Sequence, residues 1–388
     1  AMVLSGIVAL LASYSYAKLG AKFPSSGGAV EFLVRGYGKG VISGGLNIFQ
    51  WLGYILALAL YGHAFAGYLV SLLGLTDRNS LIEKAIAALL IVVFAFLQFG
   101  GTAVVGKAQT IIVGICVVVL IGFAIGGLFF IEPSRVEFSA WDGPVNILFA
   151  AGIVFIGFEG FGLVTNTAGG MKNPAKELPK ALYLSIGIVV VIYVLTAITL
   201  IGNLTVAQIN EGQGFALAEA VGSFAGRFGL VVLSITALFA TASAVNATIF
   251  GSANASYQIA RDGELPSEFD RKVWSPNARG GLFITALLAI AAIFFLDITK
   301  VTMLGSAAFL LLYATVNVGH LRIRNQTGAR GGLIWASMLS CLFLFVFLSI
   351  YIVQTEGILT MILIVIMLAV SFGAEKAFRE YRNHSTAT

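Results

Sequence analysis

The stretch Gly152-Ile-Val-Phe-Ile-Gly-Phe-Glu-Gly-Phe-Gly162 decides how this chain folds, because it sets an acidic residue among four glycines inside an apolar segment. Each glycine inside a helix costs up to about 1 kcal/mol relative to alanine, so this segment is the one most prone to unwind. Glu159 is the only carboxylate deep in any apolar segment, and a charge there costs about 3 kcal/mol. Unwound backbone survives at membrane depth only where it lines a cavity. We therefore centre the candidate site on residues Gly157–Gly160.

The composition excludes a water-soluble globular domain. Of the 388 residues, 59% are hydrophobic and only 11% are charged, and the mean hydropathy is +0.96. Soluble domains carry about 25% charged residues. One soluble core cannot bury so much apolar surface, so lipid must be the solvent. The two cysteines lie in separate apolar runs and predict neither a disulfide framework nor a metal cluster, so we expect no bound metal.

Eleven apolar stretches are long enough, or nearly so, to cross a bilayer, which takes about 20 residues. They predict an all-α polytopic membrane protein. The shortest stretch, 281–296, is included because it is strongly apolar. The predicted spans are 1–17, 41–74, 83–101, 107–131, 145–168, 182–202, 228–258, 281–296, 300–319, 332–353 and 357–374.

Lysine and arginine residues gather in alternate loops. We assign the loop after the first span, and every second loop after it, to one side of the membrane. That side, which includes the C-terminal tail, holds 18 of the 23 lysine and arginine residues. Positively charged loops stay in the cytoplasm. We therefore expect residue 1 to face outside and the C-terminus to lie in the cytoplasm. The expected location is the cell membrane, either a plasma membrane or a bacterial inner membrane.

A broken helix at Glu159 would offer two opposite kinds of binding group. The first half-helix would leave carbonyl oxygens free to accept from an ammonium group, and the N-terminus of the second half would favour an anion. A zwitterion such as an α-amino acid carries both charges. The alternative is that the glycines only permit tight helix packing and that Glu159 is a neutral packing residue.

Five motifs in consistent order resemble the amino acid–polyamine–organocation (APC) superfamily of transporters. The motifs are Tyr16-Ala-Lys-Leu-Gly-Ala-Lys-Phe-Pro24, Phe155-Ile-Gly-Phe-Glu-Gly-Phe161, Met171-Lys-Asn-Pro-Ala-Lys-Glu-Leu-Pro-Lys-Ala-Leu182, Ser243-Ala-Val-Asn-Ala-Thr-Ile249 and Ala260-Arg-Asp-Gly-Glu-Leu-Pro266. The resemblance implies the LeuT-type fold, in which two inverted repeats of five helices are followed by two extra helices.

This resemblance also implies a division of the chain. Residues 1–131 would be the remainder of the first inverted repeat (family helices 2–5), and 145–319 the second repeat (helices 6–10). Residues 332–374 would form the two additional helices, and 375–388 a cytoplasmic tail. Residue 1 then corresponds to the family's second helix, so we expect the family's first helix to be missing from this sequence.

The same resemblance assigns roles to individual residues. On the broken helix, the carbonyls of Ile153, Val154 and Ile156 would hold the substrate's amino group, with Gly157, Phe158 and Glu159 at the pocket. Gly53 and Tyr54 match the pocket-facing positions of the family's third helix. The candidate coupling and gating residues are Glu159, Ser243, Cys116 and Phe155. Some proton-coupled members have a lysine where this chain has Cys116, and a thiol cannot replace a titrating ammonium group.

Together these features predict a secondary active transporter of amino acids that works by alternating access, either as a symporter coupled to H⁺ or Na⁺ or as an amino-acid exchanger. The alternatives are a membrane receptor or scaffold that binds amino acids without moving them, and an exchanger of polyamines or other organocations. The sequence contains no catalytic motif of an intramembrane hydrolase, so we expect neither enzyme activity nor a cofactor. We expect lipid as a partner but no nucleic acid, and the oligomeric state stays open.

Overall fold

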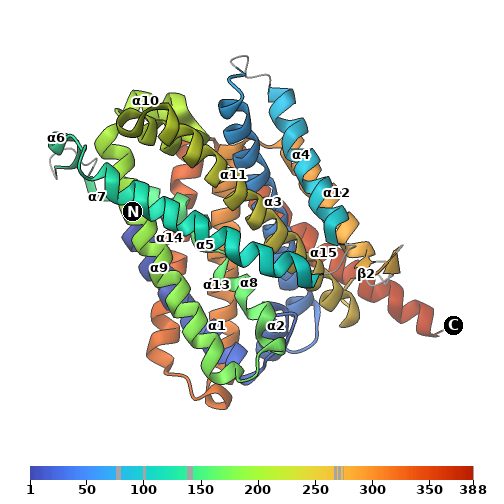
Figure 1. Cartoon of the computed structure of the whole chain (residues 1–388). Helices are drawn as coiled ribbons and strands as arrows, with labels where there is room; N and C mark the ends of the chain where they lie inside the picture. The colour runs from blue at the N-terminus through green and yellow to red at the C-terminus, as the bar shows by residue number, and fades with distance from the viewer. Residues whose placement is uncertain are drawn as a thin grey trace.

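The computed structural model describes residues 1–75, 80–98, 102–137, 143–265, 269, 272–273 and 275–387, which form a bundle of helices (Figure 1). Over its described residues, every predicted span coincides with a long helix or, for 145–168, with a series of helical segments; residues 99–101 of the predicted span 83–101 lie outside the described residues. The long helices are α1 (Met2–Lys22), α3 (Val41–Leu72), α4 (Ser80–Leu97), α5 (Thr102–Gly127), α9 (Pro174–Asn203), α11 (Ala216–Arg261), α12 (Gly280–Phe295), α13 (Ile298–Thr327), α14 (Gly331–Thr355) and α15 (Ile358–Ala387).

Short elements connect these helices. They are α2 (Ala29–Tyr37), α6 (Pro133–Val136), α10 (Val206–Gly212), η5 (Gln213–Phe215), β1 (Lys272–Val273) and β2 (Ser275–Arg279). The strands β1 and β2 pair antiparallel, with Lys272 opposite Arg279 and Val273 opposite Ser275. This hairpin between α11 and α12 is the one place in the described chain that departs from the predicted all-α fold.

Helix α11 begins before the predicted span 228–258 because two helices are joined end to end. The junction is Gly226, whose φ of 63° is a left-handed conformation that only glycine adopts without strain. The part after the junction matches the predicted span. The residues before it form a separate segment that continues from α10 and η5 at the top of Figure 1.

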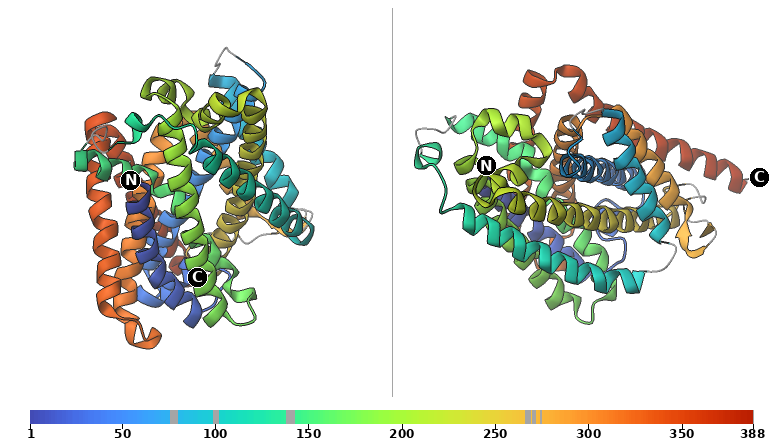
Figure 2. Two further views of the ribbon diagram at one scale, coloured as in Figure 1. Left: turned by 60° about the vertical axis from the view of Figure 1, so that its left-hand side comes forward. Right: turned by 45° about the horizontal axis from the view of Figure 1, so that its top comes forward.

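Helix α13 forms the centre of the bundle. Within its most apolar 18 residues 78% are buried, whereas the corresponding value is 17% for α5 and α9. It packs against α1, α2, α3 and α14. The C-terminal part of α15, in contrast, projects beyond the bundle (Figures 1 and 2). Helix α13, which other helices surround, therefore belongs to the interior, whereas the mostly exposed helices α5 and α9 form the perimeter.

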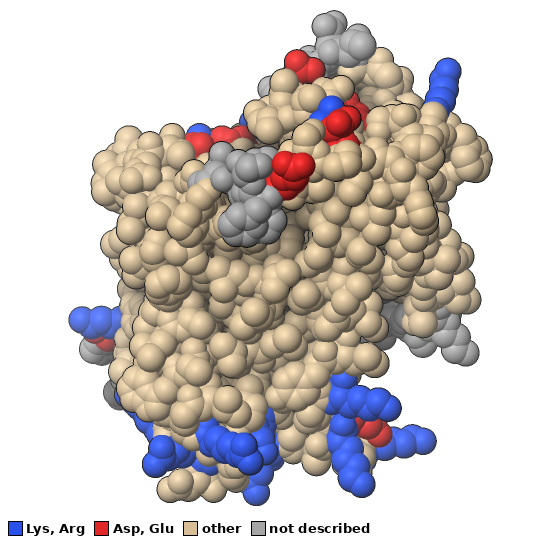
Figure 3. All heavy atoms as spheres, turned by 90° about the vertical axis from the view of Figure 1, so that its left-hand side faces the viewer, with Lys and Arg blue, Asp and Glu red and all other residues tan. Residues whose placement is uncertain are grey.

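The perimeter presents large apolar side chains outward, such as Val118 and Phe228, which are 70% and 77% exposed. Nine of the described helices are long and apolar enough to cross a bilayer, and α12 is a shorter apolar helix. In the face shown in Figure 3, an uncharged band separates the two ends of the molecule. Most of the visible lysine and arginine lies at the lower end, which we call the basic end. A surface of this kind is soluble only in lipid.

Candidate functional site

The segment that the sequence predicts to unwind does interrupt an α-helix, but it remains wound. Helix α7 (Gly143–Val154) passes into a 3₁₀ turn, η3 (Phe155–Phe158), and after Glu159 and Gly160 the chain continues as α8 (Phe161–Val164) and η4 (Thr165–Gly170). Glu159 has φ −58° and ψ −29°, and Gly160 has φ −58° and ψ −19°. Both conformations are helical, so the expected unwinding is corrected to a change from α to 3₁₀ geometry.

One hydroxyl group on α13 satisfies the backbone where the change begins. The Oγ of Ser306 donates to the carbonyl of Ile153 at 2.7 Å and accepts from the N–H of Ile156 at 2.9 Å. These are the groups that lose their helical partners when α7 ends. A buried backbone group without a hydrogen-bond partner destabilises the fold. By supplying a partner to both groups, Ser306 stabilises the change from α to 3₁₀ geometry inside the bundle.

Two tyrosines satisfy the carbonyls further along. Tyr193 of α9 donates to the carbonyl of Gly157 at 2.9 Å, and Tyr313 of α13 donates to that of Glu159 at 2.8 Å. The close approach of Tyr193 also explains the glycine, because a Cβ at position 157 would lie 3.1 Å from its ring. These hydroxyl groups occupy two of the carbonyl oxygens that a fully broken helix would leave for a ligand.

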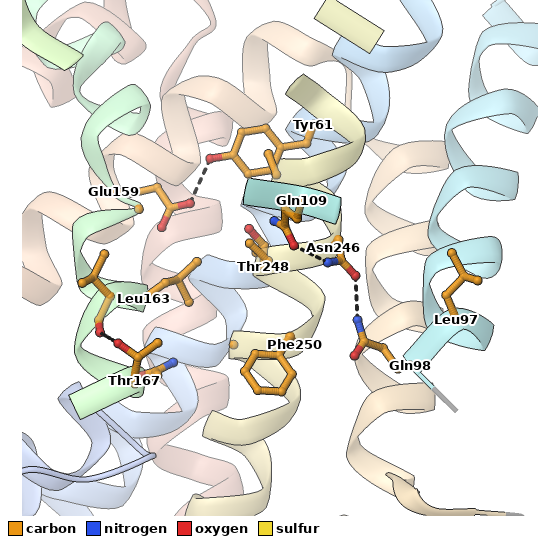
Figure 4. Close-up of a pocket in the computed structure, with 16 residues that line it drawn as sticks. Tyr61, Leu97, Gln98, Gln109, Glu159, Leu163, Thr167, Asn246, Thr248 and Phe250 are labelled. Carbon is orange, nitrogen blue, oxygen red and sulfur yellow. Dashed lines mark hydrogen bonds between the residues drawn. The ribbon is translucent and has the colours of Figure 1, made fainter. Parts of the chain in front are cut away.

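The Glu159 side chain is fully buried and only half satisfied. Its Oε1 accepts from the hydroxyl of Tyr61 on α3 at 3.1 Å (Figure 4). Its Oε2 has no hydrogen-bond partner among the residues that the structure describes. Taking a carboxylate oxygen out of water without a partner costs several kcal/mol. A ligand that carries a hydrogen-bond donor or a positive charge would recover that cost.

Glu159 faces a cavity of about 460 Å³ between α3, α8 and α11. Three amides form a chain along the opposite wall (Figure 4). Gln98 donates to Asn246 at 2.9 Å, and Asn246 donates to Gln109 at 2.8 Å. The chain ends where Gln109 donates to the hydroxyl of Ser243 at 2.9 Å. Among the described lining residues Glu159 is the only ionisable one apart from the Tyr61 phenol, so the cavity is polar but nearly uncharged.

Most of the residues predicted on the broken helix lie beside this cavity and not in its wall. The carbonyls of Ile153, Gly157 and Glu159 have hydroxyl partners, and that of Ile156 accepts from the N–H of Glu159. Val154 ends α7. Of the predicted residues on this segment, Glu159 is the one that lines the cavity.

The aromatic residues of the segment pack inside the bundle. Phe155 lies against Tyr313 and Phe158 against Tyr193, with ring centroids 5.9 and 5.3 Å apart. Phe155 is fully buried, and the gating role predicted for it stays a prediction.

The predicted residues on other helices are spread over the bundle. On α3, Gly53 and Tyr54 pack against Phe309 of α13. Ser243 lies at the end of the amide chain, where it accepts from the cavity-lining Gln109, but it is not itself part of the cavity lining. The thiol of Cys116 faces the carbonyl of Thr236, 3.5 Å away, outside the cavity lining. The binding and coupling roles assigned to these residues remain predictions.

Sequence reasoning missed seven polar residues that line the cavity, namely Tyr61, Gln98, Gln109, Asn166, Thr167, Asn246 and Thr248. Tyr61 follows Tyr54 by seven residues, which places both on one face of α3, so the helical period could have found it. Amides within apolar helices are also expensive in lipid and therefore informative. Gln98, Gln109 and Asn246 contact one another although they come from the residue after α4, from α5 and from α11. No local sequence pattern predicts these contacts.

The comparisons with known proteins identify the family of this chain. A sequence model of the family described as amino acid permease matches residues 1–372. The chain belongs to the amino acid permease family. An uncharacterized protein of Methanocaldococcus jannaschii is 38% identical over 90% of this chain and 80% of its own length. The inner membrane transport protein YbaT of Escherichia coli is 30% identical over 85% of this chain and 76% of its own length.

The fold of the permease is also found in a solved structure. A mutant manganese transporter of Eremococcus coleocola superposes with a TM-score of 0.62, covering 97% of this chain and 86% of the other. At 12% identity this likeness concerns the fold alone. The permease is thus a multi-pass membrane transporter with a LeuT-type helix bundle, as its APC-like motifs predicted.

Proposed function

We propose that this permease carries neutral amino acids across the membrane by alternating access and that it binds them in the cavity at Glu159. The observation that supports this most directly is the Oε2 of Glu159, a buried atom that has no hydrogen-bond partner in the described chain and belongs to a residue that lines the cavity. The ammonium group of an amino acid supplies both a positive charge and hydrogen-bond donors to such an oxygen. The cavity of about 460 Å³ lies within the usual range for small-molecule sites.

The rest of the wall favours a substrate without a charged side chain. Glu159 can neutralise one cationic group, and in an amino acid that group is the α-ammonium. Amides and hydroxyls such as Gln98, Asn246 and Thr167 offer hydrogen bonds to the α-carboxylate or to a polar side chain. A second charge on the substrate would be buried without a partner, which costs several kcal/mol.

The transport step follows from the same segment. A helix that changes geometry between Val154 and Phe161 can tilt its two parts separately, and such discontinuous helices are where transporters bind substrate and coupling ions. The basic end of the molecule would face the cytoplasm, so that the C-terminus lies inside and the host membrane is the plasma or inner membrane. The coupling ion would be H⁺ or Na⁺.

The test is counterflow of radiolabelled amino acids into proteoliposomes that contain the full-length gene product. We expect uptake of neutral amino acids, inhibited by other neutral amino acids more strongly than by lysine or glutamate. Glu159→Gln removes the charge that faces the ammonium group, so it should lower the apparent affinity by at least about tenfold. The matched control is Glu83→Gln on the first turn of α4, away from the cavity, which should leave affinity unchanged.

The outcomes separate the competing functions. Amino-acid binding without counterflow would indicate the receptor or scaffold, and counterflow of polyamines alone would indicate an organocation exchanger. Uptake that Glu159→Gln leaves unchanged would place the substrate elsewhere. Imposed pH and Na⁺ gradients, applied one at a time, would identify the coupling ion.

A further inference from the structure

A second cavity, of about 360 Å³, lies at the basic end between the last turns of α1 and the first turns of α9. From α1 it is lined by Lys18 and Lys22 together with the alanines between and beside them. From α9 it is lined by Ala175, Pro179 and Tyr183, which are four residues apart and therefore share one face. Thr327 at the end of α13 completes the wall.

The slot is built into the sequence of two tightly packed helices. On the neighbouring face of α1 there is no spare room, because a Cβ on Gly20 would overlap the side chain of Leu178 on α9. On the slot side, small residues face each other, with Ala17 and Ala21 on α1 opposite Ala175 on α9. Helices held this close leave a gap only where side chains are short.

The slot carries positive charge that has no counter-ion in the described chain. Lys18 and Lys22 lie one turn apart on α1, and neither forms an ion pair there. Glu177 is the one acidic residue of α9, and its carboxylate accepts from the backbone N–H of Asn173 and forms no ion pair with either lysine. Two ammonium groups beside one concave surface attract an anion.

The slot also borders the lipid-facing surface. Tyr183 is 38% exposed, and the residue after it, Leu184, is 57% exposed on the same helix. A tyrosine with an apolar ring and a polar hydroxyl is typical of the level of the lipid headgroups. A ligand in the slot can therefore place an anionic group between the lysines while an acyl chain continues along α9.

We propose that the slot between α1 and α9 binds the phosphate group of an anionic phospholipid. Basic pockets between membrane helices at the cytoplasmic face suit such headgroups. The phosphate accepts from the ammonium groups of Lys18 and Lys22, and the hydroxyl of Thr327 lies at the same wall. The headgroup thereby ties α1 and α9 to the end of α13.

The slot lies at one end of a hydrogen-bond path through the core. Thr327 contacts Nε2 of His320 at 2.8 Å, and Nδ1 of His320 contacts the hydroxyl of Ser15 at 2.9 Å. Ser15 donates to the side chain of Asn317, which in turn donates to the carbonyl of Tyr313 at 2.7 Å. Tyr313 is the residue that holds the carbonyl of Glu159, so the lipid site and the substrate site share α13 as their support.

The experiment measures lipid binding to the detergent-purified protein by native mass spectrometry and by the shift in thermal midpoint. The probes are phosphatidylglycerol, phosphatidylcholine with the same acyl chains, and inorganic phosphate. We expect phosphatidylglycerol to bind and to raise the midpoint, and phosphatidylcholine to do so far less. A titration with inorganic phosphate in the absence of lipid distinguishes the two sources of phosphate. If the natural ligand is a soluble phosphate compound, inorganic phosphate should reproduce the whole midpoint shift. If it is a lipid, inorganic phosphate alone should not.

Two variants and one control locate the site. The double variant Lys18→Gln/Lys22→Gln should weaken phosphatidylglycerol binding by at least about tenfold. Ala175→Leu keeps both lysines and fills the slot, so it should have the same effect. The control Lys176→Gln/Lys180→Gln removes the same charge from α9 outside the slot lining and should retain binding. Equal binding by wild type and both slot variants, or equal binding of the two lipids, would overturn the proposal.

Discussion

At the level of single residues, the buried polar atoms of this protein fall into two groups. Some, such as the carboxylate of Glu159, have one oxygen with a partner and one without, in a residue that lines the cavity. Others, such as the hydroxyl of Tyr16, are buried in an aromatic cluster with Phe161 and Tyr313 and have no hydrogen-bond partner in the described chain. Removing the hydroxyl that donates to Glu159 should therefore lower the stability of the protein, whereas removing the hydroxyl of Tyr16 should not.

The first prediction concerns Tyr61→Phe. This substitution deletes the hydrogen bond that Glu159 receives at 3.1 Å, and both carboxylate oxygens are then buried without a protein partner. We expect a loss of about 1–3 kcal/mol in stability, measured as a lower thermal midpoint in detergent. Tyr16→Phe, the matched control, removes an unsatisfied hydroxyl and should be neutral or stabilising. Equal destabilisation by both variants would contradict this account.

At the level of elements, the length of apolar segments was predictable and the geometry of the break was not. A bilayer requires about 20 apolar residues whatever the partners of a helix are, so the spans could be recognised one at a time. The glycines around Glu159 located the interruption for an equally local reason. Whether the segment unwinds depends on hydroxyl groups from Ser306, Tyr193 and Tyr313, which come from two other helices. No pattern near residue 159 contains that information.

Ser306 offers a direct test of this support. Ser306→Ala leaves the carbonyl of Ile153 and the N–H of Ile156 without their partner on α13. We expect a loss of about 1–3 kcal/mol and faster amide hydrogen exchange confined to residues 153–162. Ser349→Ala, which removes only a bond to the carbonyl of Phe345 within α14, is the matched control and should change little. Unchanged exchange in 153–162 would mean that the 3₁₀ turn holds itself.

At the level of the whole molecule, one carboxylate joins two regions that are far apart in the sequence and lies near a third. Glu264 lies in the loop after α11 and is 1% exposed. It accepts from Ser43 at 3.1 Å and from Asn47 at 2.7 Å, both on α3. Close to it, Glu375 of α15 is paired with Arg379 at 2.7 Å. The motif around Glu264 was noticed in the sequence only as a family resemblance, because its partners are more than 100 residues away.

The protonation of Glu264 should make the stability of the whole bundle depend on pH. Burial raises the pKa of this carboxyl from 4.5 to about 7, against the opposing effect of the hydrogen bonds from Asn47 and Ser43, and the negative charges of Glu375 and Asp262 add to the rise. Between pH 4.5 and about 7 the folded protein keeps a proton that the unfolded chain has released. Stability therefore falls as pH rises through this window, by at most about 1.4 kcal/mol per pH unit, and levels off above it.

The measurement is the thermal midpoint of wild type and Glu264→Gln from pH 5 to pH 8. Glutamine can still accept from Asn47, and it has no proton to lose, so the midpoint of the variant should fall less steeply than that of wild type across the window. Glu83→Gln, on the first turn of α4, should follow the wild-type curve. The two curves of wild type and Glu264→Gln should diverge as pH rises, since only wild type acquires a buried charge. If they stay parallel, the titrating group lies elsewhere, and the junction of α3, α11 and α15 does not sense pH through Glu264.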